Sequence, residues 1–396
     1  MRPVRVIGAA AHRWGKFADR SSLQMAIATL GDALDDAGIA WRDLQGLVAA
    51  SSRFEGGMGW GLHANEIVQA AGEHGIACVN VGGACAAGAV GFHTACGMIA
   101  SGQADIVAVI GAEKMPRGFI PRPPGSQDDI HDGDYVRWVA MGATNPAYWA
   151  IEARRRMHDY GTTRTIMAKA AVSMRENGAR NPRARFQTAT SAEEVLASPT
   201  VSDPLHLLEV CAVSDGAAAL ILASEERARQ LGAFPIHAAG YGIGTGLFGD
   251  PAIRVPTVAA TPREGIGHTS ELLQAVDRAF AMAGIERSDV DLIEIADNST
   301  WQILAWPEML GLAAPGQMDW LVEQGEIAPE GKLPVNPSGG FLSFGEATTA
   351  QALLQICECV WQLRGQADKR QVPDPKVAMS AVLGLGANGG SVILTR

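Results

Sequence analysis

An internal repeat constrains the fold of this chain more than any other feature of its sequence. Residues 33–44 (ALDDAGIAWRDL) match residues 279–290 (AFAMAGIERSDV). In both copies a predicted helix ends at Ala-Gly-Ile, where the glycine suits a left-handed helix cap, and an aspartate precedes the next predicted strand. The tetrapeptide Gly-Gln-Ala-Asp also occurs twice in the same order, at 102–105 and 365–368. We therefore expect two similar halves, joined near residues 225–245.

Short β-branched runs alternate with alanine-rich stretches along the chain. The hydrophobic periods predict strands over 4–8, 44–50, 77–81, 106–111 and 217–223, and helices over 23–37, 86–100 and 148–158. This order is typical of an α/β protein with a largely buried sheet. Between about 115 and 205 the pattern changes to proline, arginine and amphipathic helix, which predicts an insertion lying over the sheet. The predicted division is an N-terminal half, residues 1–235, that carries the insertion, and a C-terminal half, residues 236–396.

The balance of charge excludes several classes of partner. The 396 residues contain 32 lysines and arginines and 42 aspartates and glutamates, a formal net charge of −10. This sign disfavours binding to nucleic acid or to an anionic membrane surface. Six cysteines without CxxC spacing indicate neither a disulfide framework nor a zinc site, so no metal is expected. With no apolar leader and no run of about 18 apolar residues, the expected location is cytoplasmic.

One cysteine stands at a position suited to a nucleophile. Cys85 lies in the run NVGGACAAGA, between the predicted strand 77–81 and the predicted helix 86–100. The dipole and the free N–H groups of a helix N-terminus stabilise a thiolate, and small neighbours leave room for a substrate. The alternative is that Cys85 is a small buried apolar residue. If the halves surround a pseudo-twofold axis, the helices after Cys85 and Gly345 point their N-termini toward one centre.

Several runs of residues resemble one family. Residues 82–88 (GGACAAG) with 100–105 (ASGQAD) resemble the nucleophile segment of the thiolases. Four further stretches are similar to the sterol-carrier-protein-x type branch of that family: 154–163, 203–208, 213–219 and 335–340. The resemblance covers nearly the whole chain and implies a thiolase-like, five-layered αβαβα fold of two pseudo-symmetric halves. It also implies acyl-CoA chemistry in which Cys85 accepts an acyl group, with coenzyme A as a substrate and no covalently bound cofactor.

Three departures from the thiolase pattern concern the catalytic groups. Where a typical thiolase carries a histidine, this chain has Glu346. A carboxylate can act as the base if apolar surroundings raise its pKa toward neutrality, and Glu346 can equally cap its own helix as a first-turn acid. Where relatives carry a histidine or asparagine, Ala296 has no such group. Asn298 is then a candidate donor to an oxyanion, with Asp297 as an alternative cap of the following helix.

The third departure is in the glycine-rich loop 380–390. This loop lacks the second cysteine that degradative and biosynthetic thiolases use as acid and base on the α-carbon. Its backbone amides, that of Gly386 especially, are expected to contribute an oxyanion site. Without the second cysteine, simple condensation of two acetyl-CoA molecules is disfavoured.

Anionic coenzyme A needs cations in spite of the acidic balance. The candidates for its phosphates are arginines in or beside the insertion: Arg117, Arg122, Arg154, Arg155, Arg156 and Arg164. A charged solvent face explains most of them equally well. Met141 resembles a residue of the pantetheine tunnel, with core packing as the alternative. The resemblance also implies contacts with substrate or coenzyme A at Ser338, Gly339 and Gly340.

The departures also indicate which partner and reaction to expect. A chain that keeps Cys85 without the histidine and second cysteine resembles the thiolase branch that works with a small subunit carrying a zinc ribbon and an OB-fold. The stretches 362–367 and 370–373 are similar to that branch. The implied protein is a homodimer that binds acyl-CoA, as part of lipid or aromatic degradation. It cleaves or forms a β-ketoacyl-CoA through an acyl-cysteine.

Two alternatives to this function stay open. One is a retro-aldolase acting on a β-hydroxyacyl-CoA, with Tyr241 or Glu346 as acid and base. Phe344 stands where a phenol is wanted, which favours the cysteine-dependent reaction. The other alternative is a non-catalytic scaffold subunit that binds coenzyme A.

Overall fold

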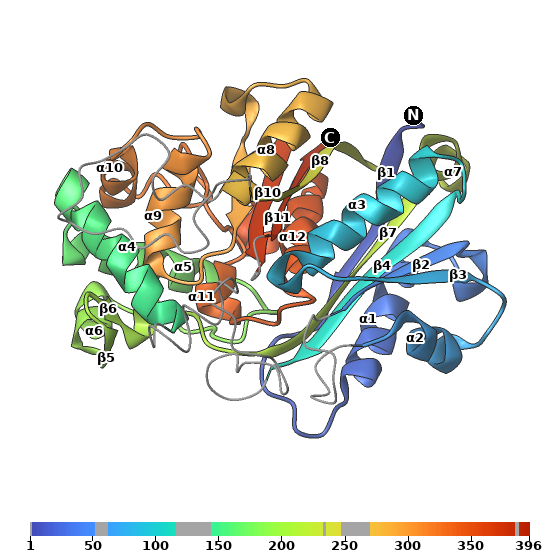
Figure 1. Ribbon diagram of the computed structural model, residues 1–396, viewed down its shortest axis with the longest axis horizontal. Coiled ribbons are helices and arrows are strands. Elements are labelled where there is room, and N and C mark those ends of the chain that lie inside the picture. The colour runs from blue at the N-terminus through green and yellow to red at the C-terminus, as the bar shows by residue number, and fades with distance from the viewer. Residues whose placement is uncertain (1, 52–61, 116–143, 233–234, 247–269, 385–387) are drawn as a thin grey trace.

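A mixed sheet and the helices on its faces form the frame of the protein (Figure 1). The computed structural model describes residues 2–51, 62–115, 144–232, 235–246, 270–384 and 388–396. In this part of the chain the sheet has nine strands: β1 (Val4–Ala11), β2 (Gly46–Ala50), β3 (Ala77–Val81), β4 (Ile106–Lys114), β7 (Asp215–Ser224), β8 (Ile236–Thr245), β9 (Leu292–Ile295), β10 (Val377–Gly384) and β11 (Asn388–Thr395).

Helices flank the sheet and fill the insertion. They are α1 (Ser22–Ala37), α2 (Ala64–Ala71), α3 (Ala87–Ala100), α4 (Asn145–Tyr160), α5 (Arg164–Ala179), α6 (Ala192–Ala197), α7 (Glu225–Leu231), α8 (Ser270–Ala283), α9 (Thr300–Met309), α10 (Gln317–Glu323), α11 (Gly340–Phe344) and α12 (Gln351–Arg364). The insertion also holds a small ribbon of β5 (Thr200–Ser202) and β6 (Leu205–His206). None of the described helices combines the length and the apolar character that crossing a membrane requires.

The two halves of the sheet have the same strand order and the same strand directions. In one half β2 is parallel to β4, β4 is antiparallel to β7, and β7 is antiparallel to β1. In the other half β9 is parallel to β10, β10 is antiparallel to β11, and β11 is antiparallel to β8. In the first half β3 lies parallel beside β2, and in the second half a parallel bridge between Ile293 of β9 and Val335 takes the same place. The pseudo-symmetric halves that the repeat predicts are confirmed.

The two copies of the repeated segment also fold alike. Gly38 after α1 and Gly284 after α8 both have a φ of 66°, a left-handed conformation that ends a helix. A 3₁₀ turn follows in each copy. The carboxylates of Asp43 and Asp289 accept the backbone N–H at the start of their turns, at 2.8 and 2.9 Å. The repeated aspartate is therefore a cap that leads the chain into the next strand.

The layers alternate between helix and sheet. α1 covers the outer face of one half of the sheet, and α8 covers the outer face of the other. Between them lie α3 and α12, which contact strands of both halves. β1 joins the halves through its pairing with β8, Arg5 opposite His237 and Val6 opposite Ile236. The expected five-layered αβαβα fold is confirmed.

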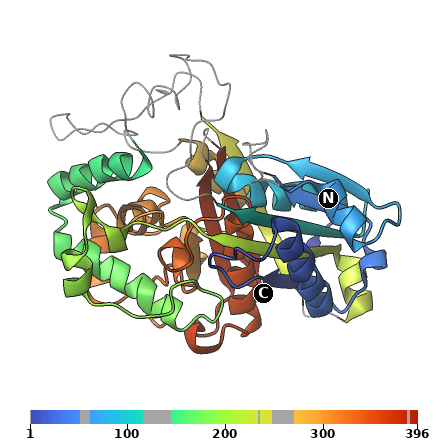
Figure 2. The same ribbon diagram turned by 90° about the horizontal axis from the view of Figure 1, so that it is seen from below.

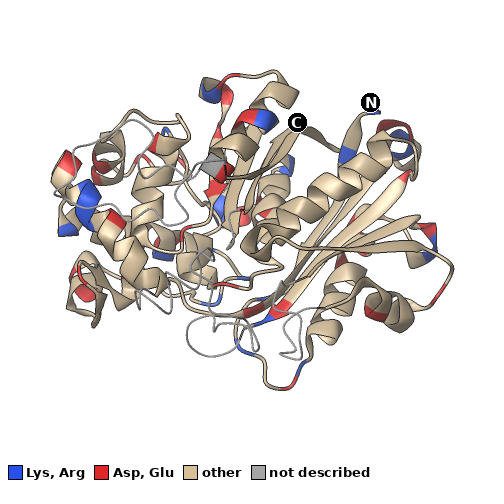
Figure 3. Cartoon of the chain, in the orientation of Figure 1, with Lys and Arg blue, Asp and Glu red and all other residues tan. Residues whose placement is uncertain are grey.

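Small side chains let the two central helices approach closely. A Cβ on Gly88, in the first turn of α3, would lie 2.9 Å from the backbone nitrogen of Leu353 and 3.1 Å from the Cβ of Ala352, both in the first turn of α12. A larger residue at Gly88 would push the helices apart. Most charged residues lie toward the periphery of the molecule, and α3 has none (Figure 3). The N-termini of the two central helices therefore meet, as the repeat predicts.

The described part of the insertion forms a helical body beside the C-terminal half (Figure 2). α5 packs against α9, α10 and α11, and α4 packs against α9. In residues 144–205 the helices of the insertion are therefore covered by other helices, and the position of the whole insertion over the sheet stays a prediction. The limits 115–205 of the insertion and the division of the chain after residue 235 stay predictions.

The strand over 77–81 forms as predicted, but it is not buried. β3 is the edge strand next to β2, and its residues are exposed or half-buried, with Val79 39% exposed. A mainly apolar edge strand is a ready template for pairing with another chain. The predicted strand 106–111 is longer than expected and extends to Lys114 as β4, while 217–223 lies within β7.

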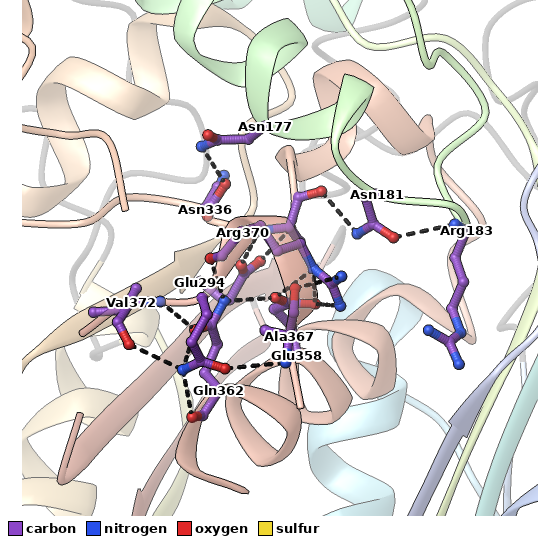
Figure 4. A network of polar contacts seen from close by, with 12 residues as sticks. Asn177, Asn181, Arg183, Glu294, Asn336, Glu358, Gln362, Ala367, Arg370 and Val372 are labelled. Carbon is purple, nitrogen blue, oxygen red and sulfur yellow. Dashed lines mark hydrogen bonds and ion pairs between the residues drawn. The ribbon is translucent and has the colours of Figure 1, made fainter. Parts of the chain in front are cut away.

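A buried ion pair anchors α12 to the segment that leads into β10 (Figure 4). The guanidinium of Arg370 donates to the Glu358 carboxylate at 2.9 and 3.0 Å, and neither side chain is more than 1% exposed. The amide of Gln362 donates to Glu358 and to the carbonyl of Arg370, both at 2.9 Å. Removal of either partner leaves the other charge buried without a counter-charge. The loss of Arg370 or Glu358 is therefore expected to lower the free energy of unfolding.

Replacing Arg370 by methionine is expected to lower the free energy of unfolding by about 3–5 kcal/mol, because the Glu358 carboxylate stays buried without its partner. Urea unfolding followed by circular dichroism measures the change. The control is Lys376→Met, which removes an exposed ion pair with Asp374 and is expected to cost less than about 1 kcal/mol. Equal losses in the two variants would contradict the importance of the buried pair.

Candidate active site

Cys85 occupies a strained turn at the start of the first central helix. Ala84–Ala86 is a 3₁₀ turn that leads directly into α3, and Ala84 has a φ of 48°. This left-handed conformation costs a residue with a side chain roughly 1–3 kcal/mol and is typical of functional turns. β10 lies against the turn, since a Cβ on Gly384 would be 2.1 Å from the carbonyl oxygen of Gly83. The thiol of Cys85, a residue 8% exposed, is therefore fixed where the two halves meet.

A short segment that follows the insertion, residues 210–214, runs between two loops of the C-terminal half. On one side the backbone N–H of Cys211 donates to the carbonyl of Asn298 at 2.9 Å. On the other side Glu346 exchanges two backbone hydrogen bonds of 2.7 Å with the segment, one of them from the N–H of Ser214. Because backbone pairing fixes both loops, Asn298 and Glu346 flank Cys211 on opposite sides.

The side chains of Cys211, Asn298 and Glu346 form one hydrogen-bonded cluster, named here the Cys211 cluster. The amide nitrogen of Asn298 donates to Glu346 Oε1 at 2.5 Å and to Cys211 Sγ at 3.7 Å. Glu346 and Cys211 lie close enough for each group to shift the pKa of the other. Cys85 lies close enough for its charge to raise the pKa of Cys211. Glu346 is 7% exposed, whereas Asn298 and Cys211 are half-buried, so the cluster borders solvent on their side.

Burial sets the charge state of the Cys211 cluster. Removal of the carboxyl group from water raises the pKa of Glu346 to about 7, and hydrogen bonds from Asn298 and Cys211 offset only part of this effect. Burial also raises the pKa of the Cys211 thiol well above its ordinary value, and the Glu346 charge raises it further. At neutral pH the cluster therefore contains a protonated thiol and a carboxyl group near its midpoint, which suits it to accept a proton.

The structure shows which of the two acidic residues beside the site caps a helix. Glu346 caps no helix, because it lies in the link between α11 and α12 with its backbone paired to residues 210–214. Asp297 does cap a helix, but the expectation that it caps the next helix along the chain is wrong. Its carboxylate accepts from the N–H of Phe341 at 2.6 Å and from that of Leu342 at 3.3 Å, at the start of α11. Burial raises the pKa of Asp297 to about 8.

The turn Ser338–Gly340 is held by buried polar groups around it. The hydroxyl of Ser338 donates to Glu294 at 2.8 Å, and the amide of Asn181 donates to the Ser338 carbonyl at 3.0 Å. One turn earlier in α5, Asn177 donates to the carbonyl of Asn336 at 3.1 Å. These contacts hold the segment that leads into α11. Contact of Ser338, Gly339 or Gly340 with a substrate stays a prediction.

The candidate cations form ion pairs with neighbouring side chains. Arg154 and Arg164 both pair with Asp203, and the buried Arg156 pairs with Glu308 and Asp319. Arg155 is also in an ion pair, with Asp159. Contact of Arg154 with coenzyme A stays a prediction, as do the roles of Met141, Gly386, Arg117 and Arg122, which lie outside the described residues.

The two aromatic candidates pack into the core. The ring of Tyr241, on β8, meets the rings of Phe92 and His93 edge-on at 6.2 and 5.4 Å between centroids. These partners lie about two turns beyond Cys85 in α3. Phe344 is fully buried, with its ring centroid 5.7 Å from that of Trp14. The described contacts of both residues are therefore with the core and not with the Cys211 cluster.

Cys211 is the residue of the site that sequence reasoning missed. It begins the run CAVSDGAAA, two residues before the start of the stretch 213–219 that carries part of the resemblance. Nothing in this run indicates that the segment returns to Asn298, 87 residues further along the chain. The one available signal was its place beside a motif of the family.

Fold and site together define a class of protein. A cysteine at the N-terminus of a central helix, held between two copies of one α/β half and beside a buried carboxyl group, defines a thiolase-type acyltransferase acting on coenzyme A thioesters. The chain belongs to the thiolase family. Residues 4–226 match the thiolase N-terminal domain, and residues 255–396 match the thiolase C-terminal domain-like family.

Known proteins of this family resemble the chain over most of its length. An acetyl-CoA acetyltransferase of Methanothermobacter thermautotrophicus is 34% identical over 398 residues, 99% of this chain and 98% of that protein. Human sterol carrier protein 2 is 33% identical over 340 residues, 83% of this chain and 60% of that protein. The solved Ltp2-ChsH2(DUF35) aldolase has a TM-score of 0.82 and 28% identity, covering 100% of this chain and 98% of that one. The resemblance to the sterol-carrier-protein branch is confirmed.

Iodoacetamide is expected to alkylate Cys85 faster than the core thiols Cys96, Cys357 and Cys359. The helix N-terminus favours the Cys85 thiolate, whereas burial raises the pKa of the other three thiols. The experiment uses a Cys78→Ser background, because Cys78 is exposed. Peptide mass mapping over time measures each site.

The control for this reaction is Cys85→Ser in the same background, which is expected to lose the fast phase. Alkylation of Cys85 as slow as that of Cys357 would contradict its assignment as an activated thiol.

Proposed function

We propose that the protein cleaves or forms a β-ketoacyl-CoA by transferring an acyl group through Cys85. The observation that carries this proposal is the position of Cys85 at the start of α3, next to the Cys211 cluster. The Cys85 thiolate attacks the C3 ketone, the bond between C2 and C3 breaks, and C2 leaves as the enolate of a shorter acyl-CoA. Free coenzyme A then takes the acyl group from the sulfur.

Glu346 is the proposed base of this reaction. It takes the proton of the Cys85 thiol, directly or through one water, and later returns it. Its pKa of about 7 matches this task, because a carboxyl group with an ordinary pKa near 4.5 is too weak a base for a thiol. Asn298 donates to Glu346 at 2.5 Å and thereby orients it.

The oxyanion formed at C3 needs N–H donors. We assign this role to the backbone amides around Cys85 and Gly386, together with the amide of Asn298. In the observed arrangement Asn298 already donates to Glu346 and Cys211, so it must turn from one of these acceptors when substrate binds. The proposed contacts with the coenzyme A moiety are Met141, Arg154, Ser338, Gly339 and Gly340.

A second candidate function is retro-aldol cleavage of a β-hydroxyacyl-CoA. The observation that favours it is the likeness to the solved Ltp2-ChsH2(DUF35) aldolase, at 28% identity over the full chain. In that reaction Glu346 would take the proton of the substrate hydroxyl, and Cys85 would form no bond. A non-catalytic scaffold is disfavoured, because a buried carboxyl group with a raised pKa costs stability that a scaffold does not need.

The proposed assembly is a homodimer with a small zinc-ribbon and OB-fold partner subunit. Support for the dimer is the exposed edge strand β3, where Val79 is 39% exposed. Support for the partner is that the similar solved aldolase is a complex with a DUF35 component.

All six cysteines are thiols, which fits the reducing cytoplasm proposed as the location. Lipid or aromatic degradation is the proposed context.

Mixing the protein with a 3-ketoacyl-CoA and quenching in acid is expected to trap an acyl group on Cys85, seen as a mass increase of the peptide containing it. Cys85→Ala is expected to lose both the adduct and thiolytic turnover, whereas Cys96→Ala, a change in the core of α3, keeps both. A matched 3-hydroxyacyl-CoA tests the second candidate. Its cleavage by Cys85→Ala at the wild-type rate would contradict the proposal and establish the retro-aldolase.

The kcat/KM of the wild type is expected to rise with pH around a midpoint near 7, because only the ionised form of Glu346 accepts a proton. Glu346→Gln is expected to lower kcat/KM by about 100- to 10,000-fold and to remove this rise.

The control is Glu323→Gln, which changes a carboxyl group 44% exposed on α10 and leaves the profile unaltered. A midpoint near 7 that remains in Glu346→Gln would show that another group is the base.

A further inference from the structure

A second thiol lies in the site, on a segment separate from the nucleophile. Cys211 accepts a hydrogen bond from the amide of Asn298 at 3.7 Å, and the same amide donates to the neighbouring Glu346 carboxyl group at 2.5 Å. Of the six cysteines, Cys78 is exposed and four are buried, while Cys211 has intermediate exposure. Its neighbours Val210, Ala212 and Val213 are half-buried as well. Cys211 therefore lies at the border of the buried site, and the amide of Asn298 helps to fix the position of its sulfur.

The surroundings of Cys211 keep its proton in place. Burial raises the pKa of the thiol most, and the charges of Glu346, Asp297 and Cys85 act in the same direction. The hydrogen bond from Asn298 opposes them. Cys211 is therefore protonated at neutral pH, which makes it a poor nucleophile but a proton donor to a carbanion beside it.

We infer that Cys211 delivers the proton to the α-carbon of the departing acyl-CoA, and removes it in the reverse direction. This inference rests on the proposed function, which needs such a group and left it unassigned. The glycine-rich loop 380–390 of the C-terminal half contains no cysteine. The second thiol of the site lies instead on the segment 210–214, near the end of the N-terminal half.

The protons balance over the two half-reactions. The Cys85 thiol gives its proton to Glu346, its sulfur bonds to C3, and the electron pair of the broken bond between C2 and C3 stays on C2. Cys211 then gives its proton to C2, and its thiolate takes the proton held by the neighbouring Glu346 carboxyl group. In the second half the coenzyme A thiol gives its proton to Glu346 and its sulfur bonds to the acyl carbon. The Cys85 sulfur leaves and regains the proton from Glu346.

This sequence separates two measurable reactions. Exchange of the acyl group between acetyl-CoA and isotopically labelled coenzyme A needs Cys85 and Glu346 alone. Exchange of the α-hydrogens of acetyl-CoA with deuterium oxide needs Cys211. Acetyl-CoA is the probe because it carries both the thioester and the α-hydrogens.

Cys211→Ala is expected to lower α-hydrogen exchange at least about 100-fold and to leave acyl exchange within about tenfold of the wild type. Cys211→Ser keeps the size and the hydrogen bonding of the residue, but its hydroxyl is too weak an acid, so it is expected to restore none of the α-hydrogen exchange. Cys96→Ala, the matched change of a buried thiol outside the site, leaves both rates unchanged. Mass spectrometry of acetyl-CoA follows both reactions.

Four outcomes would overturn the inference. They are α-hydrogen exchange that survives in Cys211→Ala, exchange restored by Cys211→Ser, an equal fall of both reactions as expected of a purely structural residue, and a wild type that exchanges no α-hydrogen. A wild type that exchanges α-hydrogens but forms no acyl-Cys85 would instead contradict the proposed function alone.

Discussion

The site depends on the backbone hydrogen bonds that hold residues 210–214 between two loops of the other half. Cys211 is bonded to Asn298 on one side, and Glu346 pairs with the segment on the other. Each bond contributes only about 1 kcal/mol of net stability, but breaking one leaves peptide groups unsatisfied in a mostly buried place. Peptide hydrogen bonds therefore bring together three side chains that are distant in the chain, and the amide of Asn298 then links them.

Burial gives these side chains their chemistry and costs stability. Glu346 and Asp297 have pKa values raised from 4.5 to about 7 and from 3.8 to about 8. A carboxyl group whose pKa is higher in the folded protein than in the unfolded chain binds its proton more tightly when folded. It therefore adds to the free energy of unfolding below its unfolded pKa, and this contribution is lost as the pH rises through its folded pKa. Both residues therefore favour the folded protein most in acid and least above pH 8. Such a cost is typical of a functional site.

The fold was predictable because local signals repeat. The Ala-Gly-Ile caps, the aspartates at 43 and 289 and the small residues of α3 all act within a few residues of where they stand, so the halves, the central helices and the place of Cys85 follow from the sequence. Contacts across long sequence separations did not follow. Asp297 caps α11 and not its neighbour, β3 lies exposed at an edge, and Cys211 reaches Glu346 through tertiary pairing that no local pattern encodes. Glu346 was singled out because its position resembles that of a known base, and its place in the link between α11 and α12 excludes the helix cap, while its role as the base stays a proposal.

The central claim is that tertiary packing holds one carboxyl group, that of Glu346, near neutrality beside two thiols. Titration of the protein by isotope-edited infrared spectroscopy, with ¹³C-labelled glutamate carboxyl groups, measures this directly as the difference between wild type and Glu346→Gln. The account predicts a difference signal that changes from the protonated to the ionised form around pH 7. A signal that titrates near 4.5, as an exposed glutamate does, would contradict it.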